Sequence, residues 1–274
     1  IVANGQVVVA SKRKQVQHPT GGVIRALHAE DGTKVKAGAV LLELEDAEAA
    51  ERYTRARDLL YLAIASEARL KAESLDSGTL EYGADLMAAA KADPAVQAIV
   101  VGQRQLFEAR RLELRGQLSI IEEQHEQLKN ELAGIEAERA AAAQQIGLTN
   151  KELSAVEELY ARGFTTRTRV YALKRDIAQL SGNSGRLTAA GARTRSAMIE
   201  NELKLLQARN QLQTTIQGEL REIQAKIPNL REQYRAAKGA YDRTTIRAPV
   251  DGTVMAARNT IGSVVRPGDT ILEI

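Results

Sequence analysis

Cysteine and tryptophan are absent from the 274-residue chain, and aromatic side chains are scarce, with seven tyrosines and two phenylalanines. The absence of cysteine excludes a disulfide framework and any thiolate that would act as a metal ligand or nucleophile. The shortage of aromatics argues against a platform on which nucleic-acid bases would stack. The chain also lacks any run of about 18 apolar residues, the length that a membrane-spanning helix needs, and no signal peptide is visible.

Neither the charges nor the remaining polar residues point to an active site. The 38 basic and 35 acidic residues are interspersed, and their net charge of +3 predicts no nucleic-acid partner. There is no G-x-S-x-G sequence, no phosphate-binding glycine loop and no histidine cluster with metal-ligand spacing. His18 and His28 are predicted to be surface or half-buried strand residues, and His125 a polar residue that fixes helix register. The sequence therefore predicts no catalytic residue, no metal site, no cofactor and no enzymatic activity.

What the chain does contain is one motif written twice. Residues 19–44 read PTGGVIRALHAEDGTKVKAGAVLLEL, and residues 249–274 read PVDGTVMAARNTIGSVVRPGDTILEI. Matching positions lie 230 residues apart: Pro19 and Pro249, Gly22 and Gly252, Gly32 and Gly262, Val35 and Val265, Gly38 and Gly268, Leu42 and Leu272, Leu44 and Ile274. A constant offset over this many positions indicates an internal repeat, whose copies lie at the two ends of the chain.

Each copy has the pattern of a compact β unit. Short β-branched or aliphatic runs alternate with Asp-Gly, Ala-Gly, Ile-Gly and Pro-Gly pairs, in which glycine supplies the positive φ that tight turns need. One copy of about thirty residues is too small to bury a stable core. The two copies are therefore predicted to pack face to face as one small β-sandwich, so the ends of the chain must meet.

The residues between the two copies are typical of long helices. They are rich in Ala, Leu, Glu, Gln, Arg and Lys and contain only two prolines, Pro94 and Pro228. Asp46 is a good N-cap for a first helix over about 47–75, which residues 76–78 would end. A weaker stretch follows, with Gly83 and then Asp93 as a cap before Pro94 at a first helical position.

A hydrophobic repeat of 3.5 residues predicts a coiled coil beyond Pro94. The first series runs through Leu114, Leu118, Ile121, His125, Leu128, Leu132, Ile135, Arg139, Ala142, Ile146, Thr149, Leu153, Val156 and Tyr160. A second series runs through Ile216, Leu220, Ile223, Ile227, Leu230, Tyr234, Ala237 and Tyr241. Val170, Leu173, Ile177, Leu180 and Leu187 continue it towards the middle of the chain, but the pattern blurs over residues 182–201.

Residues 161–168 form the short break at which the two periodic arms reverse direction. Gly163 suits a helix C-cap, and Thr165 or Thr166 an N-cap for the next helix. The arms, about 94–161 and 167–243, correspond to roughly 100 Å of hairpin at 1.5 Å per residue. The fold class predicted is α+β, with a long antiparallel coiled-coil hairpin inserted into a split β-sandwich, so the molecule is expected to be a rod with a small β head.

The repeated motif resembles the half-motif of biotinyl and lipoyl carrier domains, in which a tight hairpin carries the cofactor on a lysine. Here Leu44-Glu45-Asp46 continues into Ala47 instead, and no lysine follows until Lys71. An insertion of roughly two hundred residues at this hairpin resembles the HlyD-type membrane fusion proteins, the periplasmic adaptors of type I secretion. The stretch from Gln15 to Asp46, with Gly21-Gly22 after the proline, is particularly close to the secretion branch.

The resemblance implies a division of the chain. Residues 1–18 are a strand, with Ile1–Ala10 at its start, that leads in from a truncated β-barrel or membrane-proximal region. Residues 19–45 and 244–274 are the two lipoyl half-motifs. Residues 46–92 form the first helix and a connector, and residues 93–243 the hairpin with its tip at 161–168. In this family a membrane helix precedes the first half-motif and a β-barrel follows the second, so the chain is expected to be an excised soluble fragment without its anchor.

The resemblance also implies partners and a contact site. The chain would be anchored to the inner membrane of a Gram-negative bacterium in the full-length protein and would act in the periplasm. It would assemble as a hexamer that joins an inner-membrane ABC transporter to a TolC-like outer-membrane channel. The family's tip pattern R-x3-L-x6-T/S is matched at Leu159 and Thr166, whereas Ala155 occupies the arginine position. The tip residues expected to bind the channel are Leu159, Arg162, Gly163, Phe164 and Thr166.

Three other interpretations stay open at this stage: the adaptor of a tripartite multidrug efflux pump, a biotin or lipoyl carrier, and a purely structural coiled coil. Apolar residues outside the heptad series have two possible roles, packing of the first helix on the hairpin or packing between subunits. These residues are Leu59, Leu62, Ile99 and Val100.

Overall fold

The computed structural model describes residues 13–255 and 260–274, so the strand predicted over Ile1–Ala10 lies outside the described residues. The chain divides into two compact units. One unit comprises Ile1–Arg104 together with Glu219–Ile274, and the other comprises Gln105–Gly218. Two long helices pass through both units, and each unit is described by itself below.

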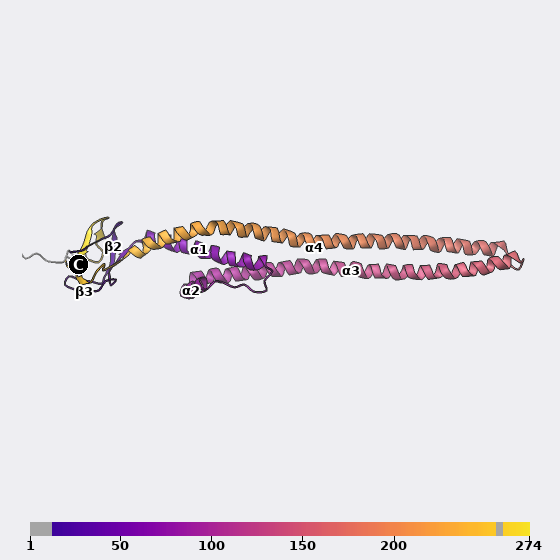
Figure 1. The fold of residues 1–274 in the computed structure, drawn as a ribbon, viewed down its shortest axis with the longest axis horizontal. Coiled ribbons are helices and arrows are strands. Elements are labelled where there is room, and N and C mark those ends of the chain that lie inside the picture. Colours follow the sequence, from indigo (N-terminus) through magenta and orange to yellow (C-terminus); the bar gives the residue numbers. More distant parts are fainter. Residues whose placement is uncertain (1–12, 256–259) are drawn as a thin grey trace, which may run out of the picture. The chain divides into compact units, whose positions relative to one another are not determined.

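The first unit contains a β module built from both ends of the chain. Its strands are β1 Gln15–Gln17, β2 Gly22–Leu27, β3 Lys34–Val35, β4 Val40–Glu45, β5 Thr245–Arg247, β6 Gly252–Thr253, β7 Val264–Val265 and β8 Thr270–Glu273. Four strands form a sheet in the order β5-β4-β2-β7, while β1 pairs with β8 and β3 with β6. All of these pairings are antiparallel, and every sheet combines strands from the two ends, whose indigo and yellow colours intermingle in Figure 1.

The two copies of the motif occupy equivalent places in this module. Gly32 and Gly262 both have positive φ, and each donates its backbone N–H to the other copy, to Val254 at 2.9 Å and to Ile24 at 2.8 Å respectively. Gly38 and Gly268 repeat the arrangement, with N–H bonds of 2.8 Å to Ala248 and 2.9 Å to His18. The predicted turn glycines therefore tie each half to the other half, and the prediction that the chain ends meet is confirmed.

The core of the β module draws equally on both copies. Its buried residues are Val16, Ile24, Ala29, Leu41, Leu42, Leu44, Ile246, Ala248, Val254, Val265, Ile271 and Leu272. His18 is buried as well, with only 4% of its surface exposed, so the prediction that it is a surface or half-buried residue is wrong. The reason lies in the repeat: His18 matches Ala248, a core position in the second copy, and takes its place in the packed layer.

Helix α1, Ala47–Ser74, leaves the β module directly after β4. The Asp46 carboxylate accepts a hydrogen bond of 2.9 Å from the Ala49 N–H, which confirms the predicted N-cap. Within the first unit α1 packs along the C-terminal part of α4, where Tyr53 stacks on Tyr241 with ring centroids 4.9 Å apart and lies 5.8 Å from Tyr234. These rings join two helices that enter and leave the β module.

A short helix, α2, Ala84–Ala92, was not predicted; the sequence suggested only a weak stretch between residues 76 and 93. Nine residues are too few for a helix to be stable alone, so α2 depends on packing. Leu86 and Ala90 are buried against Ala65 of α1 and against Val96 and Val100 of the next helix. Ile99 packs on the same cluster, whereas Leu59 and Leu62 are exposed, so only part of the apolar set serves packing of the first helix.

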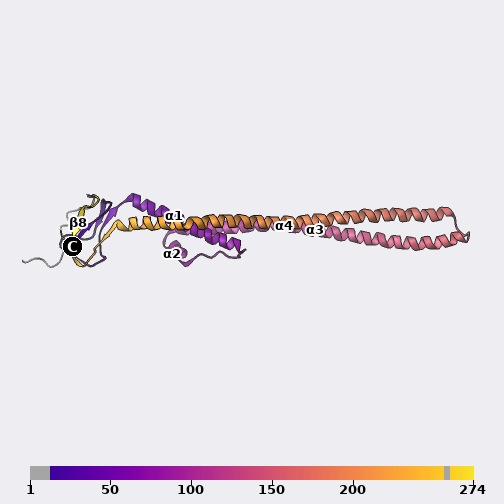
Figure 2. The ribbon, with the colours of Figure 1, turned by 45° about the horizontal axis from the view of Figure 1, so that its top comes forward.

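The second unit consists of most of α3, Pro94–Ala161, the turn that follows it, and the N-terminal part of α4, Arg167–Arg243; the two helices are long and antiparallel. They lie side by side in both Figure 1 and Figure 2, and their bounds are those predicted from the periodicity. Along the α3 series from Leu114 to Tyr160, every position except Arg139 and Tyr160 is half-buried or buried. Outside the series, residues 112–160 are exposed, so the 3.5-residue seam is confirmed, including His125 as one of its members.

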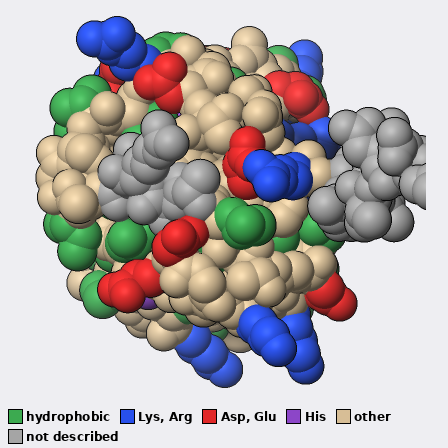
Figure 3. Space-filling view, turned by 90° about the vertical axis from the view of Figure 1, so that its left-hand side faces the viewer, with side chains coloured by type: hydrophobic (Ala, Val, Ile, Leu, Met, Phe, Trp, Pro, Cys, Tyr) green, Lys and Arg blue, Asp and Glu red, His purple; other side chains and the backbone are tan. Residues whose placement is uncertain are grey.

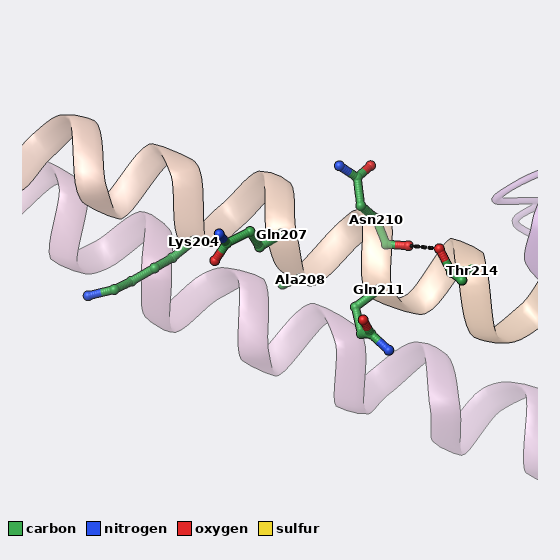
Figure 4. Close-up of a pocket in the computed structure, with 6 residues that line it drawn as sticks. All are labelled: Lys204, Gln207, Ala208, Asn210, Gln211 and Thr214. Atoms are coloured by element: carbon green, nitrogen blue, oxygen red, sulfur yellow. Dashed lines mark hydrogen bonds between the residues drawn. The ribbon is translucent and has the colours of Figure 1, made fainter.

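The blurred part of α4 is a seam made of small and polar residues. Gly191, Thr194 and Asn201 are all buried, at spacings that continue the heptad from Leu187. Thr194 donates its hydroxyl to Glu131 of α3 at 3.2 Å, and Asn201 donates its amide to Gln124 at 3.3 Å. A shallow polar groove on the same helix follows, lined by Lys204, Gln207, Ala208, Asn210, Gln211 and Thr214 (Figure 4). The helix pairing is thus continuous where hydrophobicity alone lost the register.

Candidate partner-binding site at the helical turn

The turn between α3 and α4 closes with a Schellman motif, a compact C-cap that leaves little backbone freedom. Gly163 has φ +80°, and its N–H donates to the Tyr160 carbonyl at 3.0 Å. The Phe164 N–H donates to the Leu159 carbonyl, also at 3.0 Å. These are the two bonds that define the motif, so the prediction that Gly163 caps the helix is confirmed. On the other side of the turn, the Thr166 carbonyl accepts from the Arg169 N–H at 3.1 Å, which places Thr166 directly before α4.

Apolar side chains at this turn face solvent. Phe164 is 78% exposed and Leu159 46%, and Tyr160 and Tyr171 are exposed as well. The other phenylalanine of the chain, Phe107, is buried, as the hydrophobic effect favours. Because the Phe164 ring stays in water, it contributes little buried apolar surface to the stability of the fold. An exposed ring on an ordered turn is therefore suited to contact another molecule.

Ion pairs within and between the two helices lie next to the turn. Arg162 bonds to Glu158 on its own helix, and Arg169 of α4 bonds to Glu152 of α3. Lys174 of α4 lies 2.8 Å from Glu157 of α3, and this carboxylate raises the pKa of Lys174 through the hydrogen bond and its charge. All of these side chains are largely exposed, so solvent screens each pair and its contribution to stability is small.

The residues predicted for channel binding come together at this turn. Leu159 lies in the last turn of α3, Arg162, Gly163 and Phe164 lie in the turn itself, and Thr166 directly precedes α4. Ala155, which takes the place of the family arginine, is exposed on α3 and offers no side-chain donor. Sequence reasoning did not assign Tyr160, Arg167 or Tyr171 to the partner-binding site, although an aromatic residue on each flank of a glycine turn is a signal that the sequence contained.

Outside the turn, the described residues meet neither the requirements of a metal site nor those of a membrane-spanning helix. The part of the chain that is described contains no group of three or more His, Asp or Glu side chains placed to hold a metal ion. Among these residues, no helix has the length and apolar character needed to cross a bilayer. His28 is exposed and bonds to Glu43 at 3.2 Å; Arg25 and His28 together hold the pKa of Glu43 below its usual range, with the Arg25 bond as the larger cause.

The surface of the β module is charged with both signs rather than with one. On the face shown in Figure 3, basic and acidic side chains alternate with apolar ones. At the place where a carrier domain would present its lysine on a tight hairpin, β4 ends at Glu45, Asp46 is the N-cap and α1 follows. The module therefore lacks the tight hairpin on which the carrier interpretation depends.

Comparisons with known proteins agree with this architecture. A family model described as the long α-helical hairpin of AprE matches residues 49–240. The type I secretion system membrane fusion protein PrsE of Rhizobium meliloti is 32% identical over 99% of this chain and 62% of its own length. The alkaline protease secretion protein AprE of Pseudomonas aeruginosa is 28% identical over 98% of this chain and 62% of its own length. This chain thus spans less than two thirds of these curated relatives.

A solved structure shows the same fold. The crystal structure of the soluble domain of LipC, a membrane fusion protein of a type I secretion system, matches with a TM-score of 0.75 and 27% identity. The match covers 96% of this chain and 99% of that one. The fold is therefore of the class in which a helical hairpin is inserted between the halves of a lipoyl-like β module. Within that class, the chain belongs to the AprE family of type I secretion membrane fusion proteins, and both the resemblance and the fold class inferred from the repeat are confirmed.

Proposed function

We propose that the protein acts as a periplasmic adaptor, which links an inner-membrane ABC transporter to a TolC-like outer-membrane channel for type I protein secretion. The observation that carries the proposal is the family match across the helical hairpin, together with relatives named as secretion membrane fusion proteins. The role is mechanical and interfacial rather than enzymatic. In this role the full-length protein is anchored in the inner membrane, and its copies assemble as a hexamer.

In this proposal the parts of the chain divide the work. Residues 19–45 and 244–274 act as one lipoyl-like module that packs against neighbouring copies. Residues 46–92 join that module to the hairpin, and residues 93–243 act as a stiff spacer whose seam resists bending. The tip residues Leu159, Arg162, Gly163, Phe164 and Thr166 contact the channel. Their support is the ordered Schellman turn and the exposed apolar side chains that it presents.

Deleting the gene from the bacterium that carries it tests the function directly. We expect mass spectrometry of the culture medium to show the loss of at least one exported protein, with export restored by the intact gene. An unchanged set of exported proteins combined with greater sensitivity to small toxic compounds would instead identify an efflux adaptor and contradict the secretion role.

A pulldown tests the tip. The Leu159→Ala/Thr166→Ala double variant is expected to lose capture of the channel protein by at least about tenfold, as the loss of central contacts does in other interfaces. The matched control is Leu148→Ala, because Leu148 is also exposed on α3 but lies outside the turn. Equal capture by all three proteins would remove the tip from the proposal.

A further inference from the structure

The turn carries charge of one sign. Residues 159–171 include Arg162, Arg167 and Arg169 but no aspartate or glutamate. Two of these arginines are neutralised by glutamates of α3, Arg162 by Glu158 and Arg169 by Glu152. Arg167 bonds instead to a neutral group, the phenol of Tyr171. The net positive charge of the turn is therefore concentrated on Arg167.

The contact with Tyr171 orients the Arg167 guanidinium without neutralising it. Nε and Nη2 of Arg167 donate to the Tyr171 hydroxyl at 2.9 and 2.6 Å. The guanidinium carbon lies 5.1 Å from the centre of the same ring, within the range of a cation–π contact. A guanidinium has five N–H donors, so this arrangement leaves donors available for a carboxylate.

The stability of α4 does not explain this cation. Arg167 is the first residue of α4, and the positive end of a helix dipole disfavours a cation in the first turn. The first turn of α4 holds no acidic residue that would offset it. A carboxylate from another molecule would satisfy both the guanidinium and the dipole. Phe164, three residues earlier, is exposed on a turn whose backbone is already ordered, so a contact through its ring would cost little backbone entropy.

We infer that Phe164 and Arg167 form a two-part anchor, in which the ring enters an apolar socket and the guanidinium binds a carboxylate at the rim of that socket. The inference rests on the proposed function, and it specifies the partner surface: the periplasmic end of the channel protein, with acidic side chains around an apolar depression. Tyr171 is a positioning residue, because it acts by holding Arg167. Charge complementarity favours this occupant, since the turn offers an exposed apolar group and, three residues later, a cation that no carboxylate of the described residues neutralises.

The test is the affinity of the 274-residue chain for the purified channel protein, measured at several salt concentrations. Phe164→Ala and Arg167→Gln are each expected to weaken binding at least about tenfold, and Arg167→Glu to weaken it more. Binding by the unaltered chain should fall as salt rises, and Arg167→Gln should flatten that dependence. Tyr171→Phe, which removes the hydroxyl but keeps the ring, is expected to give an intermediate loss. The matched control is Arg186→Gln, because Arg186 is an exposed arginine of α4 outside the turn.

The outcomes separate this inference from the function on which it rests. If Leu159→Ala/Thr166→Ala abolishes binding while Arg167→Gln and Phe164→Ala bind normally, the anchor is wrong and channel docking stands. If the unaltered chain does not bind the channel protein at all, the proposed function is contradicted. Sedimentation of the chain alone and binding to vesicles containing phosphatidylglycerol identify other occupants. A Phe164→Ala effect confined to self-association or to vesicles would overturn the inference.

Discussion

At the scale of single residues, Gly21 shows how closely the two ends of the chain approach each other. Its φ is +72°, and a Cβ atom added there would lie 2.3 Å from the backbone carbonyl oxygen of Val265. Real Cβ atoms do not approach a carbonyl this closely, and the oxygen belongs to β7 and cannot rotate away as a side chain would. The second glycine of the Gly21-Gly22 pair then enters β2. Gly21, the first glycine of the pair that resembles the secretion branch, thus has a steric role.

Replacing Gly21 by alanine is therefore expected to destabilise the β module. We expect a loss of more than about 2 kcal/mol, because the positive φ and the clash with Val265 act together. The matched control is Gly38→Ala, where φ is +84° but nothing lies within 4 Å of the added Cβ atom, so a loss of about 1 kcal/mol is expected. Hydrogen–deuterium exchange of peptides from β2 and β7 measures the difference. Equal effects of the two substitutions would show that the backbone of β7 yields to the added methyl group.

The sequence supported some residue assignments and not others, for physical reasons. The turn glycines Gly32 and Gly262 were predictable because their conformation is local and the repeat shows each one twice. The steric need for Gly21 was not, since it depends on a carbonyl that approaches from the other end of the chain. The burial of His18 was available from its match to Ala248, but residue type alone pointed to the surface. The exposure of Phe164 likewise required the turn geometry.

At the scale of elements, the length of an element decided how well the sequence predicted it. Helix α3 repeats its apolar positions over many heptads, so the signal accumulates and both the seam and the helix bounds could be read directly. Helix α2 is only two to three turns long, and its order comes from the buried contacts of Leu86 and Ala90 with other helices. The hydrophobic pattern within residues 84–92 cannot predict contacts with other helices.

The middle of α4 lies between these two cases, because its helix was predicted but its register was not. Its heptad spacing persists through Gly191, Thr194 and Asn201, but the residues at those positions are not apolar. Gly191 faces α3 directly, since a Cβ atom added there would lie in ordinary van der Waals contact with Ile135, at 3.5 Å. Polar groups in a coiled-coil seam generally specify register at some cost in stability. Because the residues at these seam positions are small or polar, a count of apolar residues does not reveal the register of α4. The polar residues among them specify that register in the folded hairpin.

Asn201 provides the test at this scale. Its buried amide donates to Gln124 of α3, an exposed side chain that water can also satisfy. Asn201→Leu is therefore expected to raise the stability of the hairpin by about 1 kcal/mol, because an apolar side chain replaces a buried amide in the seam. Thermal unfolding followed by circular dichroism measures the change, and Asn210→Leu, an exposed position on the same helix, is the control. A loss of stability in Asn201→Leu would mean that the amide bond contributes more than apolar packing would.

At the scale of the whole molecule, the constant offset between the two motifs had the largest consequence. A repeat at both ends, in halves too small to fold alone, requires the halves to meet, and they do so strand by strand in every sheet. The periodic segment between them must then leave and return, which is what a helical hairpin does. The prediction of a hairpin between two meeting ends depends on the position of the repeat and not on the helix propensity of single segments. It therefore holds although the sequence did not predict α2 and did not give the register in the middle of α4.

A disulfide between the two halves would test this closure directly. Val23 of β2 pairs with Val264 of β7, and the Ile24 N–H donates to the Ser263 carbonyl at 3.0 Å. This pattern makes Val23 and Val264 a non-hydrogen-bonded pair, the type in which facing side chains lie closest. Both side chains are exposed, so Val23→Cys/Val264→Cys leaves the core intact, and the chain has no other cysteine to compete. The pair is expected to oxidise readily to an intramolecular disulfide, which changes mobility on a non-reducing gel.

The bond would also close a loop of about 240 residues, and the chain-entropy model then predicts a gain of up to about 5.5 kcal/mol in the stability of the β module. Slower hydrogen–deuterium exchange in β2 and β7 of the oxidised protein, compared with the reduced double variant and with each single cysteine variant, measures that gain. The reduced form controls for the loss of the two valines. Failure to form the disulfide within one chain, or its formation only between two chains, would mean that the copies of the motif pair between molecules in solution rather than within one.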